Sequence, residues 1–283
     1  MVDTNQEEWS MSASKDVELA DFCMPQRAYL RALASMVVEG YYLATEIMRL
    51  ASSVHGGSYE ERSLLERVVL PLEHAGYVSL QLRSDENGVS RTVPLVSPTE
   101  KLIGEYVFPL LDHVERGAGK DLCLLLRRPL GDILACTKAP DGRSRGLALD
   151  ALAIRLMVLL NLVYIDARVH GTATDGTMAQ LLFESTSLLL SRWQVHCRNA
   201  EMVTLDDVAT AVGLSYVLRS DVVVMVGMEA IEPRSQRFAC EVMENSKLRI
   251  AMINRADLEC VERAPSAIID VLNRESRLVL ARG

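Results

Sequence analysis

Apolar side chains recur at intervals of three and four residues in the first third of the chain, which is the spacing of a helix with one buried face. Leu30, Leu33 and Val37 show the spacing clearly. The pattern predicts three helices, over residues 27–39, 43–51 and 59–74. Ser58 and Glu61 have the spacing of a capping box at the start of the third.

The pattern then changes to the alternation of half-buried strands. It predicts strands over residues 77–82 and 91–96, with a turn at Asp85-Glu86-Asn87-Gly88 between them. Three helices followed by a hairpin resemble a winged helix-turn-helix. That resemblance implies a third helix in the major groove and a wing on the phosphates. The residues expected to contact DNA there are Tyr59, Arg62, Ser63, Arg67, Arg83 and Arg91.

A module for protein contact or dimerisation is the alternative interpretation of this region. Glu60, Glu61 and Glu66 lie on or near the proposed recognition surface. Acidic residues also slightly outnumber basic ones between Met24 and Lys120, so charge does not decide between the two.

The second half of the chain alternates between short strands and helices, a pattern typical of an α/β sheet with a parallel half. The expected strands cover residues 163–169, 179–184, 190–197, 221–226 and 248–253. The expected helices cover residues 147–161, 204–220, 233–244 and 265–274. Between the two halves, residues 138–146 form a basic loop whose Arg143 and Arg145 are further candidates for DNA contact.

These patterns divide the chain into four parts. They are an acidic tail over residues 1–23, expected to be disordered, a winged helix over 24–120, a linker over 121–145 and an α/β domain over 146–283. A further helix is expected between the hairpin and about Leu111, and the linker includes a short helical or mixed segment over residues 122–135. The tail holds six acidic residues against Lys15 alone, so it carries more than half of the net charge of −8. The rest is near neutral, which permits a basic face for DNA.

Composition places the chain among packed proteins without membrane spans. It is 49% hydrophobic and 24% charged, and Asn161 interrupts its longest apolar run. A signal-type segment is absent from the start of the sequence, so we expect no export. The six cysteines are scattered without metal-ligand spacing, which favours reduced thiols in the cytoplasm.

The second half also resembles the Mrr-like restriction endonucleases of the PD-(D/E)xK fold between Gly146 and Val261. The matching segments are a G-x-x-x-(D/E) helix start, a D-G-x turn, a strand in the place of Q-x-K, and two apolar strands. They are Gly146 to Asp150, Asp175-Gly176-Thr177, His196-Cys197-Arg198, Asp221 to Val224 and Leu248 to Ile253. The implied fold class is α/β, or α+β overall: a winged helix-turn-helix followed by a restriction-endonuclease-like mixed sheet flanked by helices.

The residues in the catalytic positions of this resemblance differ from those of active nucleases. Such enzymes need an aspartate and a second acidic or amide group to hold Mg²⁺, with a lysine beside the attacking water. The aspartate position falls on Gln180, or on Ala179 if the alignment shifts by one. His196 and Arg198 occupy the Gln/Glu and lysine positions. Histidine favours Mn²⁺ or a transition metal over Mg²⁺, and arginine stays protonated but can hold a phosphate.

A relocated metal site is the remaining route to cleavage. Asp150, Asp175 and Glu184 are the carboxylates expected near the site, and each also suits a structural role as helix residue, turn former or strand end. Asn199 could contact phosphate or end its strand. Without such a site no metal or other cofactor is expected; an active enzyme would use Mg²⁺ or Mn²⁺.

The sequence therefore predicts a DNA-binding protein of restriction, defence or repair, without standard metal-dependent cleavage. The alternatives are an active metal-dependent deoxyribonuclease with a relocated site, and a protein-interaction scaffold. DNA is the expected partner, together with a second copy of the chain or an active nuclease subunit, and no membrane is expected.

Overall fold

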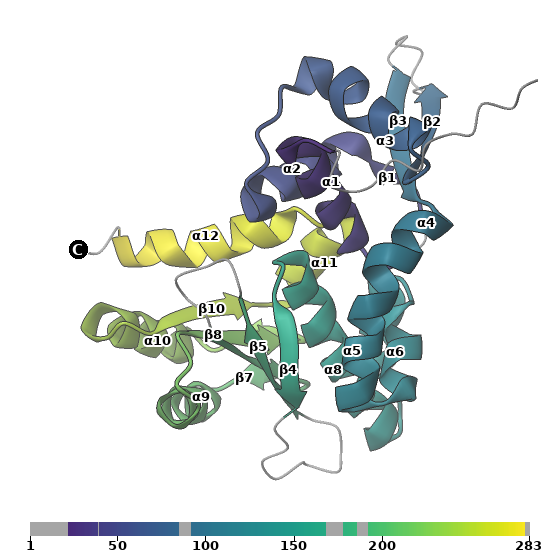
Figure 1. Ribbon diagram of the computed structural model, residues 1–283. Helices are drawn as coiled ribbons and strands as arrows, with labels where there is room; N and C mark the ends of the chain where they lie inside the picture. The colour runs from purple at the N-terminus through teal and green to yellow at the C-terminus, as the bar shows by residue number, and fades with distance from the viewer. Residues whose placement is uncertain (1–21, 39, 85–91, 168–177, 186–191, 281–283) are drawn as a thin grey trace, which may run out of the picture.

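The computed structural model describes residues 22–38, 40–84, 92–167, 178–185 and 192–280. Figure 1 shows an N-terminal unit of short helices and a small sheet, above a larger sheet that is covered by helices on both faces. The acidic segment over residues 1–21 lies outside the described residues. Phe22 belongs to the fold, because its ring is buried and packs edge-on against Tyr77.

The N-terminal unit has the order helix, strand, helix, helix, strand, strand. Its elements are α1 (Met24–Ala34), β1 (Tyr42–Leu43), α2 (Ala44–His55), α3 (Leu70–His74), β2 (Val78–Ser84) and β3 (Thr92–Pro98). The three strands form an antiparallel sheet in the order β1-β3-β2. The two expected strands are confirmed as an antiparallel pair, while the turn expected at Asp85 to Gly88 lies outside the described residues. β1 is an additional strand that is too short to show a pattern.

The third helix is less regular than its apolar pattern predicted. A 3-10 turn at Glu61–Ser63 and a π-helical turn at Leu65–Val69 precede α3. The predicted capping box at Ser58 does not form, since Glu60 directly precedes the first turn and gives no side-chain cap. The helical segment therefore begins two residues later than expected.

Helices follow the hairpin, as expected up to about Leu111, and the short helical or mixed segment expected within the linker forms two helices. After β3 come α4 (Glu100–Leu102), a π-helical turn (Ile103–Val107), α5 (Phe108–Ala118), α6 (Lys120–Leu126) and α7 (Leu130–Cys136). Both α6 and α7 pack on α8 (Gly142–Leu159). Asp141 caps α8 by accepting a hydrogen bond from the Ser144 backbone N–H at 2.8 Å. The predicted basic loop is thus partly the first turn of α8.

The larger sheet has five strands in the order β10-β8-β6-β5-β4. These are β4 (Val163–Ala167), β5 (Met178–Glu184), β6 (Arg192–Arg198), β8 (Val222–Gly227) and β10 (Arg249–Ile253). The strands β6, β8 and β10 are parallel, whereas β5 runs antiparallel to both of its neighbours. This confirms the predicted sheet with a parallel half.

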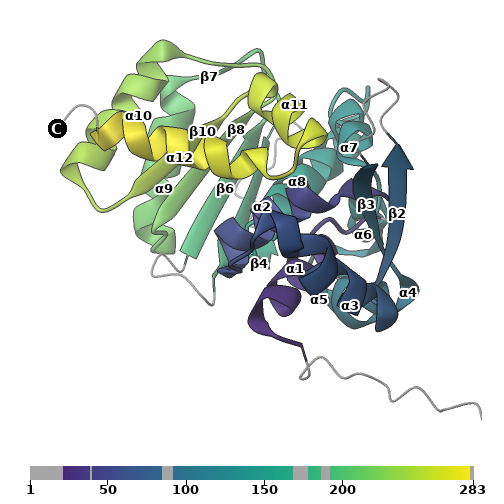
Figure 2. The same ribbon diagram turned by 90° about the horizontal axis from the view of Figure 1, so that it is seen from above.

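Helices cover the two faces of this sheet unequally. One face packs on α8, α11 (Arg255–Arg263) and α12 (Ala267–Leu280), in a core that continues into the N-terminal unit. The other packs on α9 (Leu205–Leu218) and α10 (Pro233–Asn245) in a second core. Figure 2 shows α12 crossing over the sheet. A two-stranded sheet of β7 (Met202–Val203) and β9 (Ala230–Ile231) lies beside β8.

Contacts from α12 also reach the N-terminal unit. The Ser266 hydroxyl donates to the Glu46 carboxylate at 2.6 Å, and Arg49 of α2 pairs with Asp270 of α12 at 3.5 Å. The two units therefore share both a core and polar contacts. Among the described helices, none combines the length and apolarity that a membrane crossing requires.

Candidate functional site

Alternate residues of β6 face opposite sides of the sheet, as strand geometry requires. Trp193, Val195 and Cys197 belong to the core beneath α8 and α12. Gln194, His196 and Arg198 therefore face the α9 side. Two of the three positions that the resemblance implied to be catalytic thus share one face, and the register pairs the third, Gln180 of β5, directly with His196.

Gln194 connects this face to the covering helix. Its side chain is fully buried, and its amide donates to the Ala211 carbonyl oxygen of α9 at 2.9 Å. The same amide nitrogen contacts Nε2 of His196, and the amide oxygen accepts from the Ser220 hydroxyl at 3.4 Å. A buried amide with three partners orients its neighbours, so Gln194 holds the His196 ring in place.

His196 is held as a neutral ring. Only 3% of the residue is exposed, and burial lowers its pKa to about 4, against a smaller opposing effect of Asp207. Because the Gln194 amide donates to Nε2, that nitrogen is an acceptor, and the ring proton sits on the other nitrogen. His196 is therefore a satisfied interior histidine at neutral pH.

Arg198 is paired with a carboxylate of α9. Its Nε lies 3.4 Å from Oδ1 of Asp207, an ion pair by distance that lacks hydrogen-bond geometry. The other oxygen of Asp207 accepts from the Thr204 backbone N–H and hydroxyl, both at 2.9 Å, in the capping box that begins α9. The Arg198 side chain is 30% exposed. Part of the guanidinium can thus reach a phosphate, while Asp207 offsets its charge.

Gln180 completes the cluster without a partner for its amide nitrogen. The residue is 8% exposed, and Nε2 has no hydrogen-bond partner among the described residues. An unpaired buried amide costs free energy, on the order of 1–3 kcal/mol. Gln180 therefore leaves one buried donor beside His196 unsatisfied.

Asp150 lies on the other side of the sheet from this cluster. It belongs to α8, which packs on β5 and β6, and its carboxylate raises the pKa of the Cys197 thiol together with the larger effect of burial. Burial also raises the pKa of Asp150 itself to about 6. The expectation that Asp150 joins Gln180, His196 and Arg198 in one site is therefore wrong, because the sheet separates them.

The cluster does not suit a magnesium ion. Mg²⁺ prefers carboxylate oxygens, and the side chains available are an amide, a buried neutral histidine and an arginine already bound to Asp207. No three metal-ligating side chains lie close together anywhere in the described part of the chain. We therefore derive no metal-dependent step for this site.

The remaining carboxylate and amide candidates have other positions. Asp175 lies outside the described residues. Glu184 pairs across the strands with Arg192 at 3.8 Å, at the far end of β5 from Arg198. Asn199 donates to the Thr137 carbonyl oxygen at 2.7 Å, a structural contact that joins the end of β6 to the end of α7.

The candidate DNA contacts of the N-terminal unit divide into exposed and internal residues. Arg62 and Arg67 are exposed along the irregular third helix, as is Arg83 on β2. Tyr59 instead packs edge-on against Tyr29 and donates to the Pro25 carbonyl oxygen at 2.7 Å, so it does not project outward as the helical pattern predicted. Ser63 is partly buried and donates to Glu60, and Arg91 lies outside the described residues.

The two arginines before Gly146 have local partners. Arg143 is exposed and pairs with Asp121 of α6 at 3.0 Å. Arg145 donates to the carbonyl oxygens of Ala139 and Pro140 at 3.1 and 2.9 Å. Arg145 therefore organises the turn before α8, and Arg143 is the freer of the two to meet a phosphate.

Sequence reasoning did not identify Gln194 and Asp207 as members of the cluster. Gln194 carried a signal, because it lies two residues before His196 and so shares its strand face. Thr204 and Asp207 have capping-box spacing, which places Asp207 in the first turn of α9. Only the packing of α9 on β6 brings that turn to Arg198.

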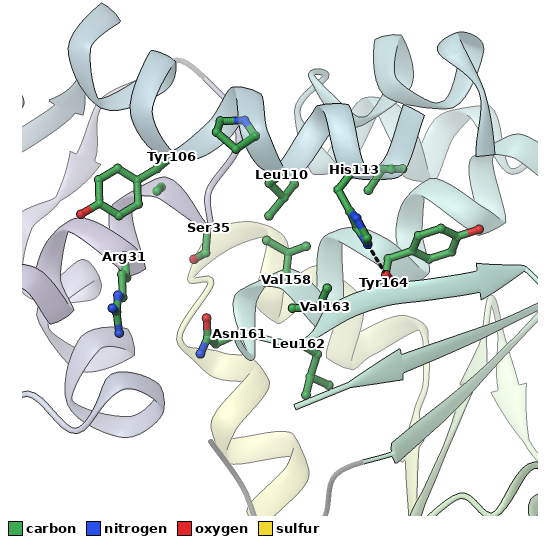
Figure 3. A pocket seen from close by; sticks show the side chains of 13 residues that line it. Arg31, Ser35, Tyr106, Leu110, His113, Val158, Asn161, Leu162, Val163 and Tyr164 are labelled. Carbon is green, nitrogen blue, oxygen red and sulfur yellow. Dashed lines mark hydrogen bonds between the residues drawn. The ribbon is translucent and has the colours of Figure 1, made fainter. Parts of the chain in front are cut away.

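A pocket of about 390 Å³ lies between the N-terminal unit and the sheet, where α1, α5, the end of α8 and β4 meet. Figure 3 shows Arg31 and Tyr106 on one side and His113 on the other, with Nε2 of His113 donating to the Tyr164 carbonyl oxygen at 2.7 Å. Its lining is mainly apolar, and none of the described residues that line it is acidic. The described residues that line this pocket therefore form no group of side chains suited to catalysis.

No protein-family model matches the chain, and no curated protein is significantly similar to it.

Proposed function

We propose that this chain is a DNA-binding protein with a winged helix and a restriction-endonuclease-like domain, without standard metal-dependent cleavage. It acts in restriction, defence or repair, as a homodimer or beside an active nuclease subunit. The observation that carries the proposal is the altered site itself. Gln180 and His196 are paired on adjacent strands, and Arg198 next to them binds Asp207.

The order of elements supports both parts of this assignment. A helix–strand–helix–helix order followed by a hairpin, with three antiparallel strands, is the arrangement expected of a winged helix. In the second half, a helix precedes three antiparallel strands, and two further strands each follow a helix. That is the order implied by the resemblance to the Mrr-like family.

The side chains at the altered site support binding over cleavage. A neutral histidine and a paired arginine cannot replace a metal-bound carboxylate pair and a tunable lysine. The exposed part of the Arg198 guanidinium can still form hydrogen bonds to a phosphate. Loss of the acid and the lysine together leaves a surface that holds DNA without cutting it.

The winged helix supplies the main contact surface in this proposal. Arg62 and Arg67 are exposed on the helix that would enter the major groove, and Arg83 is exposed on the wing. Glu60, Glu61 and Glu66 are exposed nearby. The acidic side chains would repel the backbone wherever the docking is wrong, which favours one orientation on the duplex.

Fluorescence anisotropy with a labelled duplex tests this binding surface. We expect wild-type binding to weaken as salt rises, and the double change Arg62→Gln with Arg67→Gln to lower the affinity severalfold and the salt slope by about two. Arg234→Gln, at an exposed position of α10, is the control that should retain both values. Equal affinity and slope in all three proteins would contradict the proposed surface, and no salt-dependent binding at all would favour the scaffold alternative.

A further inference from the structure

A second pocket, of about 420 Å³, lies where the N-terminal unit meets the helices of the larger domain. It is bounded by the segment that connects α1 to β1, the start of α7, the middle of α8 and the end of α11. The volume lies within the range of small-molecule sites in proteins, about 300–1,000 Å³. None of the residues proposed to contact DNA lines it.

Arg155 of α8 lines this pocket and forms no ion pair with any of the residues that the structure describes. The residue is 6% exposed, and neither Nε nor Nη1 has a hydrogen-bond partner among the described residues. The neighbouring Tyr42 hydroxyl donates to the Val38 carbonyl oxygen at 3.0 Å. Glu262 also lines the pocket, but its carboxylate lies against Gly131 and forms no described ion pair with Arg155.

An unpaired buried cation is costly, since buried charges in proteins are normally paired or bound to a ligand. Burial lowers the pKa of Arg155 to about 10, so the guanidinium still carries its charge at neutral pH. Its planar fork of N–H groups matches the two oxygens of a carboxylate or phosphate. The pocket therefore holds a recognition group for an anion and no internal anion that satisfies it.

The rest of the lining is largely apolar. Met36, Leu156 and Leu159 are buried side chains of the pocket, and Pro129 and Leu130 lie beside them. A bare inorganic ion would leave these surfaces without contacts. We propose that this pocket binds a small organic anion, in which a carboxylate or phosphate group pairs with Arg155 and an apolar body of several carbons packs on these side chains.

Isothermal titration calorimetry with defined probes tests the site on the full chain. Hexanoate and phenyl phosphate supply the two anionic groups on apolar bodies, 1-hexanol is the neutral analogue of hexanoate, and inorganic phosphate lacks an apolar body. We expect at least one organic anion to bind at millimolar concentration or below, and about tenfold more tightly than hexanol and than inorganic phosphate. The stronger of the two organic anions identifies the preferred group.

Arg155→Met removes the charge and keeps a long apolar side chain. The variant should fold with a Tm no lower than that of the wild type in buffer without added organic anion, because no protein group loses an ion pair. Its affinity for the organic anion should fall about tenfold or more. Arg234→Gln on α10 is the matched control, removing a cation from an exposed site, and should bind as the wild type does.

Three results would overturn the proposal. They are no binding of either organic anion to the wild type, hexanol binding as tightly as hexanoate, and unchanged anion affinity in Arg155→Met. The comparison of anion with hexanol uses only the wild type, so it decides the matter even if Arg155→Met fails to fold. DNA binding is measured separately and with other variants, so failure of one proposal leaves the other standing.

Discussion

Burial of His196 beneath α9 lowers the pKa of its imidazole to about 4. Between pH 6.5 and about 4 the unfolded chain takes up a proton at this imidazole and the folded chain does not. The free energy of unfolding therefore falls as the pH falls through this window. At neutral pH the ring is neutral in both states, and its burial carries no charge penalty.

Replacing His196 by glutamine should remove this part of the acid sensitivity. The loss of stability between pH 7 and pH 4 should be smaller in His196→Gln than in the wild type, by at most about 3 kcal/mol. Urea unfolding followed by circular dichroism at the two pH values measures it. His74→Gln, at an exposed position, is the control, and an acid-induced loss in His196→Gln as large as that of the wild type would contradict the assignment.

Asp150 is predicted to have the opposite dependence on pH. Its folded pKa of about 6 lies above the ordinary value of 3.8, so stability is lost as the pH rises between these values. Asp150→Asn should raise the free energy of unfolding at pH 7, by up to about 3 kcal/mol, and should have little effect below pH 4. Urea unfolding at both values checks this, and a destabilised variant at pH 7 would show that the carboxylate has a cationic partner, as a relocated metal site requires.

The clustering of Gln180, His196 and Arg198 could be predicted from the sequence, but their partners could not. The spacing of His196 and Arg198 places them on one strand face, and the antiparallel register brings Gln180 beside them. The face of the sheet that Asp150 approaches depends on the rotation of α8, which is apolar nearly all round and so has no clear buried stripe. For the same reason, the sequence did not indicate that Arg155 is buried.

At the scale of elements, strong periodicity predicted helices and strands well, and short or irregular elements poorly. The valine-rich β8 and the helices α9 and α10 lie close to their predicted bounds. The two-residue strands β1, β7 and β9 exist only because of their pairing partners. Residues 121–145 were expected to be a linker with only a short helical or mixed segment over residues 122–135, whereas α6 and α7 form there and pack on α8.

The corner between α11 and α12 depends on a partly buried ion pair. Arg274 donates to both oxygens of Asp257 at 2.8 and 3.0 Å and to the Met252 carbonyl oxygen at 3.3 Å. Asp257 is 7% exposed and also caps α11 through Asn254. This pair attaches α12 to β10 at the edge of the sheet.

Arg274→Met should therefore destabilise the protein by about 1–3 kcal/mol, because it leaves the Asp257 carboxylate buried with fewer partners. Arg143→Met is the matched control. The side chains of Arg143 and of its partner Asp121 are 81% and 65% exposed, so that change should cost less than about 1 kcal/mol. Thermal unfolding compares the two, and equal effects on Tm would contradict the role of the pair.

At the scale of the whole molecule, one core joins the two units. Buried residues from α1 to β3 form a single cluster with those of α8 and with one face of the larger sheet. The hydrogen bond from Ser266 to Glu46 also connects the same two units. The N-terminal unit is thereby held at a fixed position relative to the sheet, so under the proposed function DNA bound to one unit would meet the other in a defined orientation.

One gel assay tests the central proposal most directly. The full chain is incubated with supercoiled plasmid in low salt, with Mg²⁺ or Mn²⁺, and one half of each sample is stripped of protein before electrophoresis. The proposal predicts retarded plasmid in the untreated half and intact supercoiled plasmid in the stripped half, with either metal. Nicked or linear plasmid that depends on the metal, and whose yield falls in Gln180→Ala or Arg198→Ala, would contradict it.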